Sequence, residues 1–411
     1  MKCTTTISRS VEIGLRFIGM WPDSAYPNLY WFSYMTTIAI AQYYQYAYIF
    51  AHIDSNDIWL LMDCLSLTLA YSLVFLKLLI LWWNRRIFYY IVKAIDQDWS
   101  ECVINDSYRF TMMSMADMSR RFANIMFSMY AFSAFSLSIG EHLLQSRDDV
   151  NQFGNSSREL PIKMEFPFDV SKSPIFECFL IGQFVYDTVI AFVVSLINAL
   201  LVALILHVSG QINIMQQDLA EISNFLSRKY DRSTFLLVIR NLICKHQKII
   251  ILSQNIENLY THVALIQVLW NTLVMCCTGF VIIIVSNVSC FLHILDNFFF
   301  LILLQIISSG EDAVNLIKSV SYYTVIILEV FLYCFAGEFL SAKSKSISDA
   351  IYETLWYNLP PSDSRIILFM MLRCQKQLTI TAGRIIDLTL EGFTSIMKAS
   401  VSYISVLNAM Y

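Results

Sequence analysis

The sequence predicts an all-α protein, a seven-transmembrane helical bundle, and its composition is the first observation that indicates this fold. Of the 411 residues, 57% are hydrophobic and 15% are charged, and the mean hydropathy is +0.56. Soluble domains average about 45–50% apolar and about 25% charged residues. A single soluble core cannot hold this excess, because such cores stop growing with chain length. The net charge of −4, without long runs of one sign, argues against nucleic acid as a partner.

The second observation is a series of apolar segments long enough to cross a bilayer, which takes about 20 mostly apolar residues. Seven segments meet this requirement: 30–50, 58–83, 122–140, 174–206, 262–287, 320–340 and 379–410. The fourth and the seventh are longer than a bilayer requires, so we expect them to tilt or to protrude into water. We expect residues 1–411 to form a single transmembrane domain.

The basic residues between these segments predict the orientation of the chain. The alternate connections on the side of the N-terminus hold 20 Lys and Arg, and those on the other side hold 5. Since basic loops stay in the cytoplasm, we expect a cytoplasmic N-terminus and an extracellular C-terminus. This is the reverse of a G-protein-coupled receptor, and neither Asp-Arg-Tyr after the third segment nor Asn-Pro-x-x-Tyr in the seventh is present.

Two of the connections on the cytoplasmic side, within 207–261 and 341–378, are predicted to form anchor helices. In the first, apolar residues recur at helical spacing: Phe235, Ile239, Leu242, Ile249, Leu252, Ile256 and Leu259. In the second, residues 344–359 read as a helix that ends at Pro360-Pro361. We expect these helices to extend the membrane spans into a cytoplasmic bundle where subunits meet.

Two segments on the outer side carry separate predictions. Asn155-Ser156-Ser157 is a glycosylation sequon in the outer loop 141–173, which makes Asn155 a candidate site. Residues 285–307 include a second apolar stretch, 290–307, that is short for a span and is interrupted by His293 and Asp296. Its interpretation stays open between a native loop, a re-entrant segment and an unspliced insert.

Catalytic and metal-binding motifs are missing from the sequence. The ten cysteines show no regular spacing and no CxxC, which argues against a zinc site or a disulfide framework. HExxH, P-loop and GxSxG patterns are also absent. We therefore expect neither enzyme activity nor a cofactor or metal ion.

The C-terminal third carries a specific pattern of short motifs. These are YCFAGEFL from Tyr333, then SAKSKSISDAIYETLWYNLP, and finally FTSIMKASVSY near the end. The combination resembles the C-terminal signature of the insect odorant receptors. Gustatory receptors, which are related to them, usually end Thr-Tyr-x-x-x-x-x-Gln-Phe, whereas here Ser402-Tyr403 is followed by Ala409 and Met410 at the matching places.

The resemblance implies a ligand-gated cation channel in the plasma membrane of a sensory-neuron dendrite. In this family a tuning subunit assembles with odorant co-receptor subunits as a hetero-tetramer within membrane lipid, and a small volatile organic ligand opens the pore. The compact second cytoplasmic connection of this chain, 84–121, is typical of a tuning subunit rather than of the co-receptor. The family places the pore in the seventh span and the ligand in the outer half of the bundle.

Residues for the pore and the ligand site follow from this assignment. One stripe of the seventh span is predicted to line the pore and its apolar gate: Ser402, Tyr403, Val406 and Met410. Apolar and aromatic residues with a few polar groups, in the outer halves of spans two, three, four and six, are predicted to bind the ligand. They are Leu67, Tyr71, Phe132, Phe135, Ser136, Gln183, Tyr186, Ile190, Tyr322, Tyr323 and Ile326.

Charged residues within the apolar segments form the last group of candidates. Asp63 and Lys77 lie near the ends of the second span, so their charges are expected to reach the membrane surface. Asp187 and Glu329 lie deeper and should face the bundle interior or water. Asp187 is interpreted as structural, through a bond to a nearby Tyr or Gln.

The sequence leaves two alternative functions open. A gustatory-type channel subunit would share the fold, and the ending at Ala409 and Met410 disfavours it. A secondary transporter would be of a different class, and the sequence shows neither the internal repeat nor the paired broken helices typical of one.

Overall fold

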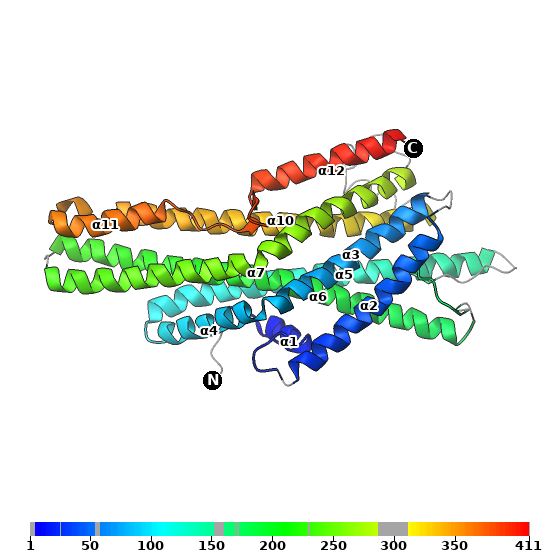
Figure 1. The fold of residues 1–411 in the computed structure, drawn as a ribbon, viewed down its shortest axis with the longest axis horizontal. Helices are drawn as coiled ribbons and strands as arrows, with labels where there is room; N and C mark the ends of the chain where they lie inside the picture. Colours follow the sequence, from blue (N-terminus) through cyan, green and yellow to red (C-terminus); the bar gives the residue numbers. More distant parts are fainter. Residues whose placement is uncertain are drawn as a thin grey trace.

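The structure, a computed structural model, describes residues 5–24, 26–53, 58–151, 160–168, 170, 172–228, 231–286 and 311–410. Most of this chain is helical, as predicted, and the helices form one elongated bundle (Figure 1). The helices are α1 (Arg9–Phe17), α2 (Pro27–Ala51), α3 (Ile58–Trp83), α4 (Arg85–Cys102), α5 (Asp106–Asn151), α6 (Ile175–Arg228), α7 (Arg232–Ser286), α10 (Glu311–Tyr352), η1 (Trp356–Asn358), α11 (Pro361–Cys374) and α12 (Leu390–Met410). The strands β1 (Thr381–Ala382) and β2 (Ile386–Asp387) form a short antiparallel hairpin.

Helix α6 is the centre of the bundle. Its sequence from 193 to 208 is apolar on almost every side, and all residues from 193 to 210 are buried. A helix that is hydrophobic all round must be covered all round. Helices α1, α3, α5, α7 and α10 provide this cover.

Four helices of the described chain are long and apolar enough, by length and composition, to cross a membrane. They are Leu60–Trp83, Ile175–Ile222, Arg232–Ile282 and Ser319–Asn358, and they overlap the predicted second, fourth, fifth and sixth spans. The other three predicted spans, 30–50, 122–140 and 379–410, correspond to α2, to part of α5, and to the β1–β2 hairpin with α12, which are not among these four helices.

Both regions predicted to hold anchor helices are largely helical: α6 and α7 run through much of 207–261, and the end of α10 and the separate helix α11 lie within 341–378. Helices α6, α7 and α10 all run beyond the predicted membrane boundaries, and α11 lies beside them at one end of the molecule (Figure 1). The predicted apolar stripe from Phe235 to Leu259 is buried at every position named above. We call the end of the molecule where α11 lies beside α6, α7 and α10 the anchor end. There, Lys245 Nζ lies 2.5 Å from Asp218 Oδ2, and this ion pair joins α7 to α6.

The start of α7 is held by a capping residue. The Asp231 carboxylate accepts hydrogen bonds from the Thr234 amide at 3.2 Å and from the Thr234 and Ser233 hydroxyls at 2.6 and 2.8 Å. These donors, the Thr234 hydroxyl first, lower the pKa of Asp231 to about 2. Such a cap satisfies backbone donors that the first helical turn leaves without partners.

Two predicted helix boundaries are wrong. Helix α10 ends at Tyr352 rather than at 359, and Pro361 instead begins α11, where its fixed φ suits the first helical position. The seventh span begins at Leu390 rather than at 379, because the β1–β2 hairpin occupies the preceding residues. Gly383 and Arg384 have φ of 64° and 60°, which a right-handed helix cannot contain.

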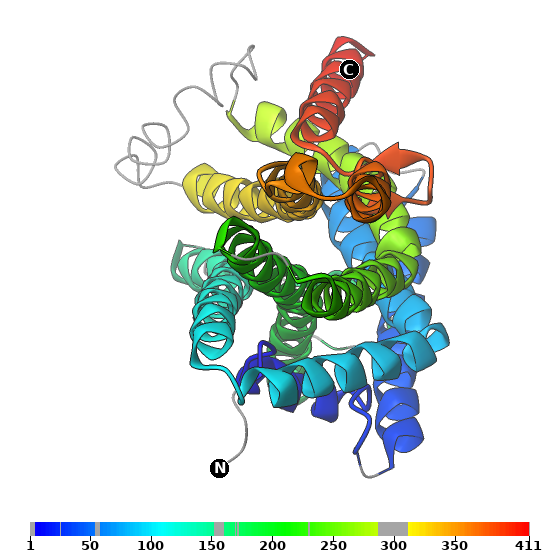
Figure 2. The ribbon, with the colours of Figure 1, turned by 90° about the vertical axis from the view of Figure 1, so that its left-hand side faces the viewer.

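The hairpin fixes the position of α12. The Gly383 amide donates to the Thr261 carbonyl of α7 at 2.8 Å, and Arg384 Nη2 donates to Asn258 Oδ1 at 2.9 Å. Helix α12 then runs along the edge of the bundle, against α7 and α10 (Figure 2). Among the described residues, one side of α12 is therefore packed against α7 and α10, and its other side is exposed.

We predict that Gly337→Ala in α10 destabilises the junction with α12. A Cβ at this position would clash with the Leu388 backbone carbonyl, which cannot rotate away. Overpacking of this kind costs about 1–3 kcal/mol, so the melting temperature of the detergent-purified protein should fall. Gly182→Ala in α6 is the matched control, since a Cβ there meets no atom within 4 Å. Equal melting temperatures for the two variants would contradict the predicted clash.

Candidate ligand-binding site

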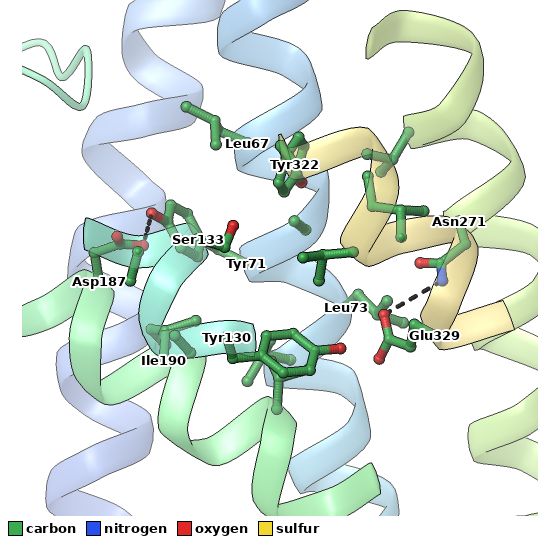
Figure 3. Close-up of a pocket in the computed structure, with 18 of the residues that line it drawn as sticks. Leu67, Tyr71, Leu73, Tyr130, Ser133, Asp187, Ile190, Asn271, Tyr322 and Glu329 are labelled. Carbon is green, nitrogen blue, oxygen red and sulfur yellow. Dashed lines mark hydrogen bonds between the residues drawn. The ribbon is translucent and has the colours of Figure 1, made fainter. Parts of the chain in front are cut away.

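Five helices line a cavity of about 80 Å³ (Figure 3). Residues three or four apart on each helix point to the same side, and such sets from α3, α5, α6, α7 and α10 form the wall. The lining residues are Leu67, Ala70, Tyr71, Leu73, Val74, Lys77, Tyr130, Ser133, Ala134, Asp187, Ile190, Ala191, Val194, Asn271, Val274, Tyr322, Val325, Ile326 and Glu329. Apolar side chains dominate, and a few polar groups converge among them.

A buried charge cluster lies at one side of this cavity, around Glu329. Lys77 Nζ donates to Glu329 Oε1 at 2.7 Å, and Asn198 Nδ2 donates to the same oxygen at 3.0 Å. Asn271 Nδ2 donates to Glu329 Oε2 at 3.3 Å (Figure 3). Asn198 Nδ2 also donates to the Tyr130 hydroxyl at 2.9 Å. The cluster therefore joins α3, α5, α6, α7 and α10.

The burial of these charged residues contradicts the prediction made for Lys77 and confirms the prediction made for Asp187 and Glu329. Lys77 is completely buried and its charge does not reach the membrane surface, because the Glu329 carboxylate compensates it inside the bundle. Asp187 and Glu329 are each only 7% exposed, so both face the bundle interior as predicted. A buried carboxylate left without its cation costs about 3–5 kcal/mol, which explains why Lys77 and Glu329 are buried together.

A second polar group of the wall is formed by Asp187 and two tyrosines. The Tyr71 hydroxyl donates to Asp187 Oδ1 at 2.9 Å, which confirms the predicted bond between Asp187 and a nearby tyrosine. The Tyr322 hydroxyl donates to the Ser66 carbonyl at 3.3 Å. Both tyrosine hydroxyls thus donate to protein acceptors, and both tyrosines line the cavity.

The structure brings five of the predicted ligand-site residues to the cavity, and six lie elsewhere. Those that line it are Leu67, Tyr71, Ile190, Tyr322 and Ile326. Phe132 and Phe135 are exposed on the outside of α5, and Ser136 donates to the Phe132 carbonyl at 2.9 Å. Tyr323 is buried away from the cavity, and Tyr186 packs edge-on against Tyr71 with 5.4 Å between ring centroids.

Gln183, near the start of α6, bonds to the segment that precedes this helix. Its Oε1 accepts from the Ile162 amide at 3.0 Å, and its Nε2 donates to the Ile162 carbonyl at 2.9 Å. Because the oxygen and the nitrogen of the Gln183 side-chain amide both bond to the backbone of Ile162, this side chain fastens the segment before α6 to that helix. Gln183 does not line the cavity.

The sequence analysis missed the side of α5 that faces the cavity. Tyr130, Ser133 and Ala134 line it, two residues before the predicted Phe132, Phe135 and Ser136. With 3.6 residues per turn, a shift of two residues leads to the opposite side of a helix. The available signal was the intramembrane polar residues Asn198 and Asn271, which need buried partners and bond to the cavity side of α5 and α10.

The predicted pore residues lie on the uncovered side of α12. Tyr403 and Val406 are 59% and 53% exposed, and Ser402 is also exposed, whereas Ser400 and Ile404 are buried against the bundle. Met410 lies beyond the residues whose side chains the structure describes. Asn155 and residues 287–307 lie outside the described residues, so the predictions on them stay open.

A second, more open cavity of about 540 Å³ lies at the anchor end, between α5, α6 and α7. Its wall holds Asp218, Glu221, Lys245 and Lys248, with Tyr108 bonded to Asp218. Burial, and then the hydrogen bond to Asp218, raises the pKa of Tyr108. Ligand sites for small apolar molecules are mostly apolar and enclosed, so the cavity between α3 and α10 is the better candidate. Among the described residues, no group of three or more His, Cys, Asp and Glu could hold a metal ion.

Comparisons with known proteins identify the fold. The solved structure of the insect olfactory receptor OR5 from Machilis hrabei in complex with eugenol matches with a TM-score of 0.76 and covers 98% of this chain and 97% of that one. Sequence identity over this match is 15%. The likeness confirms the seven-transmembrane fold at the level of the whole chain, including α2, α5 and α12.

Sequence comparisons point to the same family. Odorant receptor 82a of Drosophila melanogaster is 23% identical over 254 residues, which is 62% of this chain and 58% of that receptor. The odorant receptor coreceptor of Aedes aegypti is 30% identical over 118 residues, which is 28% of this chain and 25% of the coreceptor. The matched region thus spans about three fifths or less of these relatives. The family model of the seven-transmembrane odorant receptor matches residues 57–310 and 299–401. This chain therefore belongs to the seven-transmembrane odorant receptor family.

Proposed function

We propose that this chain is an odorant receptor, the ligand-tuning subunit of a cation channel that it forms with odorant co-receptor subunits in a hetero-tetramer. The observation that carries the proposal is the mostly apolar cavity between α3, α5, α6, α7 and α10, within the fold of an olfactory receptor that was solved with eugenol. A small volatile organic ligand would bind there, since sites for such ligands are concave, apolar and fitted with few polar groups.

The size of the cavity limits the ligand. An engineered apolar cavity of about 150 Å³ in another protein binds benzene, whereas the cavity here measures about 80 Å³. Even a ligand as small as benzene must therefore push the wall of this cavity outward. We therefore propose that binding moves α3 or α10 relative to α6, which gives the ligand a mechanical effect on the bundle.

The pore would be formed by α12, one from each subunit. Helix α12 packs only against one side of the bundle, and its exposed side carries Ser402, Tyr403 and Val406. An apolar ring blocks ions by excluding water, and Val406, with Met410 one turn further on, has the chemistry of such a gate. Because α7 and α10 contact both the cavity and α12, they would transmit the movement of the wall to the pore.

Location and assembly complete the proposal. The receptor would lie in the plasma membrane of a sensory-neuron dendrite, with the N-terminus and the anchor end in the cytoplasm and Asn155 glycosylated outside. The anchor end, where α6, α7, α10 and α11 lie together, would hold the subunits in contact. The receptor would need no cofactor and would perform no enzymatic reaction.

We predict that cells expressing this chain together with a co-receptor give a dose-dependent cation current in response to members of a panel of small volatiles. The current should reverse at the potential set by the cation gradients and should not need a gradient of the volatile. Cells that express the co-receptor alone, with equal surface labelling, are the control for ligands of the co-receptor itself. A current that follows an imposed gradient of the organic compound would indicate a transporter and contradict the proposal.

We predict that Val406→Ser raises the resting current of the assembled channel. Replacing this side chain lowers the cost of hydrating the gate by roughly 1–2 kcal/mol per subunit, so the resting current should rise by about tenfold. Val185→Ser on α6 is the matched control, because Val185 is 54% exposed and Val406 is 53% exposed. If both variants keep the resting current of the unchanged receptor at equal surface expression, the gate does not lie at Val406.

A further inference from the structure

The exposed side of α12 is polar along most of its length. Its exposed charged and small hydroxyl residues are Glu391, Thr394, Ser395, Lys398, Ser402 and Ser405. The exposed side of α6 near its start is mainly apolar by comparison, and it includes Ile181, Phe184 and Val185. Charged and polar residues inside a membrane usually face a bundle interior or water rather than lipid, so the exposed side of α12 fits an aqueous surface better than a lipid one.

Lys398 is a charged residue that lies well inside this helix. It follows Leu390, the first residue of α12, by eight residues, which is about 12 Å along the helix axis. Its side chain is exposed, and its ammonium group forms no ion pair or hydrogen bond with any residue of the described chain. Lys77, in contrast, is buried against the Glu329 carboxylate. The charge of Lys398 is thus left for water or for ions outside this subunit.

Lys398 lies on the same side of α12 as the proposed gate. Lys398, Ser402 and Val406 follow one another at intervals of four residues, so their side chains point to the same side of the helix. Ser400 and Ile404, which lie between them in the sequence, are buried against the bundle. The rise from Lys398 to Val406 is about 12 Å. If α12 borders the ion path at Val406, Lys398 therefore borders the same path on the cytoplasmic side of the gate in the proposed orientation.

The acidic residue on this side of α12 does not cancel the charge of Lys398. Glu391 precedes Lys398 by seven residues, which is about 10 Å along the helix axis. Dissolved ions screen an exposed charge over about 8 Å at physiological ionic strength. Glu391 therefore gives the start of α12 a negative charge, whereas the field around Lys398 stays positive.

We propose that Lys398 determines which cations pass the pore: its ammonium group repels them and thereby favours monovalent over divalent ions. This inference rests on the proposed function, with α12 at the pore, and assigns a residue to ion selectivity. The repulsion energy is proportional to the charge of the ion, so the factor by which it slows Na⁺ is squared for Ca²⁺. For an ion about 6 Å from an ammonium group in water, that factor is about threefold for Na⁺. Each Lys398 beside the pore thus lowers the permeability ratio of Ca²⁺ to Na⁺ by about threefold.

The test compares reversal potentials of the volatile-evoked current with Na⁺ or Ca²⁺ as the external cation, in cells that express the receptor with a co-receptor. Lys398→Met removes the charge and keeps a flexible side chain, so the permeability ratio of Ca²⁺ to Na⁺ should rise by about threefold or more. Lys398→Glu reverses the charge and should raise the ratio by about tenfold. Lys398→Arg retains the charge and should keep the original ratio. An unchanged ratio in both Lys398→Met and Lys398→Glu, with normal evoked current, overturns the inference.

A matched control separates a charge beside the pore from a charge elsewhere on the receptor. Lys93 is exposed on α4, outside the pore helix, so Lys93→Met removes the same charge at a different place. This variant should keep the original permeability ratio. If Lys93→Met and Lys398→Met shift the ratio equally, the effect comes from the net charge of the receptor surface, and the assignment of Lys398 is wrong.

A further variant keeps the test valid if Lys398→Met and Lys398→Glu do not reach the cell surface. Lys398→Cys should raise the permeability ratio, and 2-aminoethyl methanethiosulfonate, which attaches an ammonium group to the thiol through a disulfide and releases methanesulfinate, should lower it again. The unchanged receptor treated with this reagent is the control for the exposed Cys178 and Cys244, and a ratio that neither step changes contradicts the inference. Failure of the underlying function has a different result, since no volatile would then evoke current from unchanged receptor at the surface. Evoked current with one selectivity in all Lys398 variants refutes only the role of Lys398.

Discussion

The transmembrane part of this structure depends on the Glu329 carboxylate, because it bonds side chains from three other helices in the buried interior of the bundle. Lys77 of α3, Asn198 of α6 and Asn271 of α7 all donate to it, at 2.7, 3.0 and 3.3 Å. Apolar helices in lipid gain little from the hydrophobic effect when they associate, so packing and polar bonds between them set their arrangement. Replacing any one donor would leave buried charge or amide without a partner, which makes the relative positions of these helices specific.

The same cluster makes one side of the cavity ionic and leaves the rest of its wall mostly apolar. Glu329 holds α3, α6, α7 and α10 together at one side of the cavity, whereas apolar contacts and the Tyr71–Asp187 bond form the rest of the wall. A ligand larger than about 80 Å³ would displace the apolar part more easily than the ionic part. Since α7 and α10 also carry α12 and the hairpin that precedes it, a displacement of these helices reaches the edge of the bundle where the pore is proposed.

Much of the fold could be predicted from the sequence, and the errors have local physical causes. Apolar length located the spans, and the stripe from Phe235 to Leu259 located the anchor helix, because burial of one helical side leaves a periodic pattern. The start of α12 was missed because the positive φ at Gly383 and Arg384 breaks a segment that looks continuous by hydropathy. The cavity side of α5 was missed because aromatic residues suit lipid and pocket equally well, so Phe132 and Phe135 gave no direction. The pairing of Lys77 with Glu329 joins distant parts of the chain, and no local pattern encodes it.

The most direct test of this account is the dose–response of the co-expressed receptor when the cavity is filled by a larger side chain. Ala191 lines the cavity on α6, and Ala191→Phe would occupy most of its volume, whereas Val185→Phe adds a similar ring to the exposed side of the same helix. The account predicts that Ala191→Phe raises the half-maximal ligand concentration by at least about tenfold at equal surface expression, and that Val185→Phe leaves it unchanged. Unchanged potency in Ala191→Phe would show that the ligand acts elsewhere.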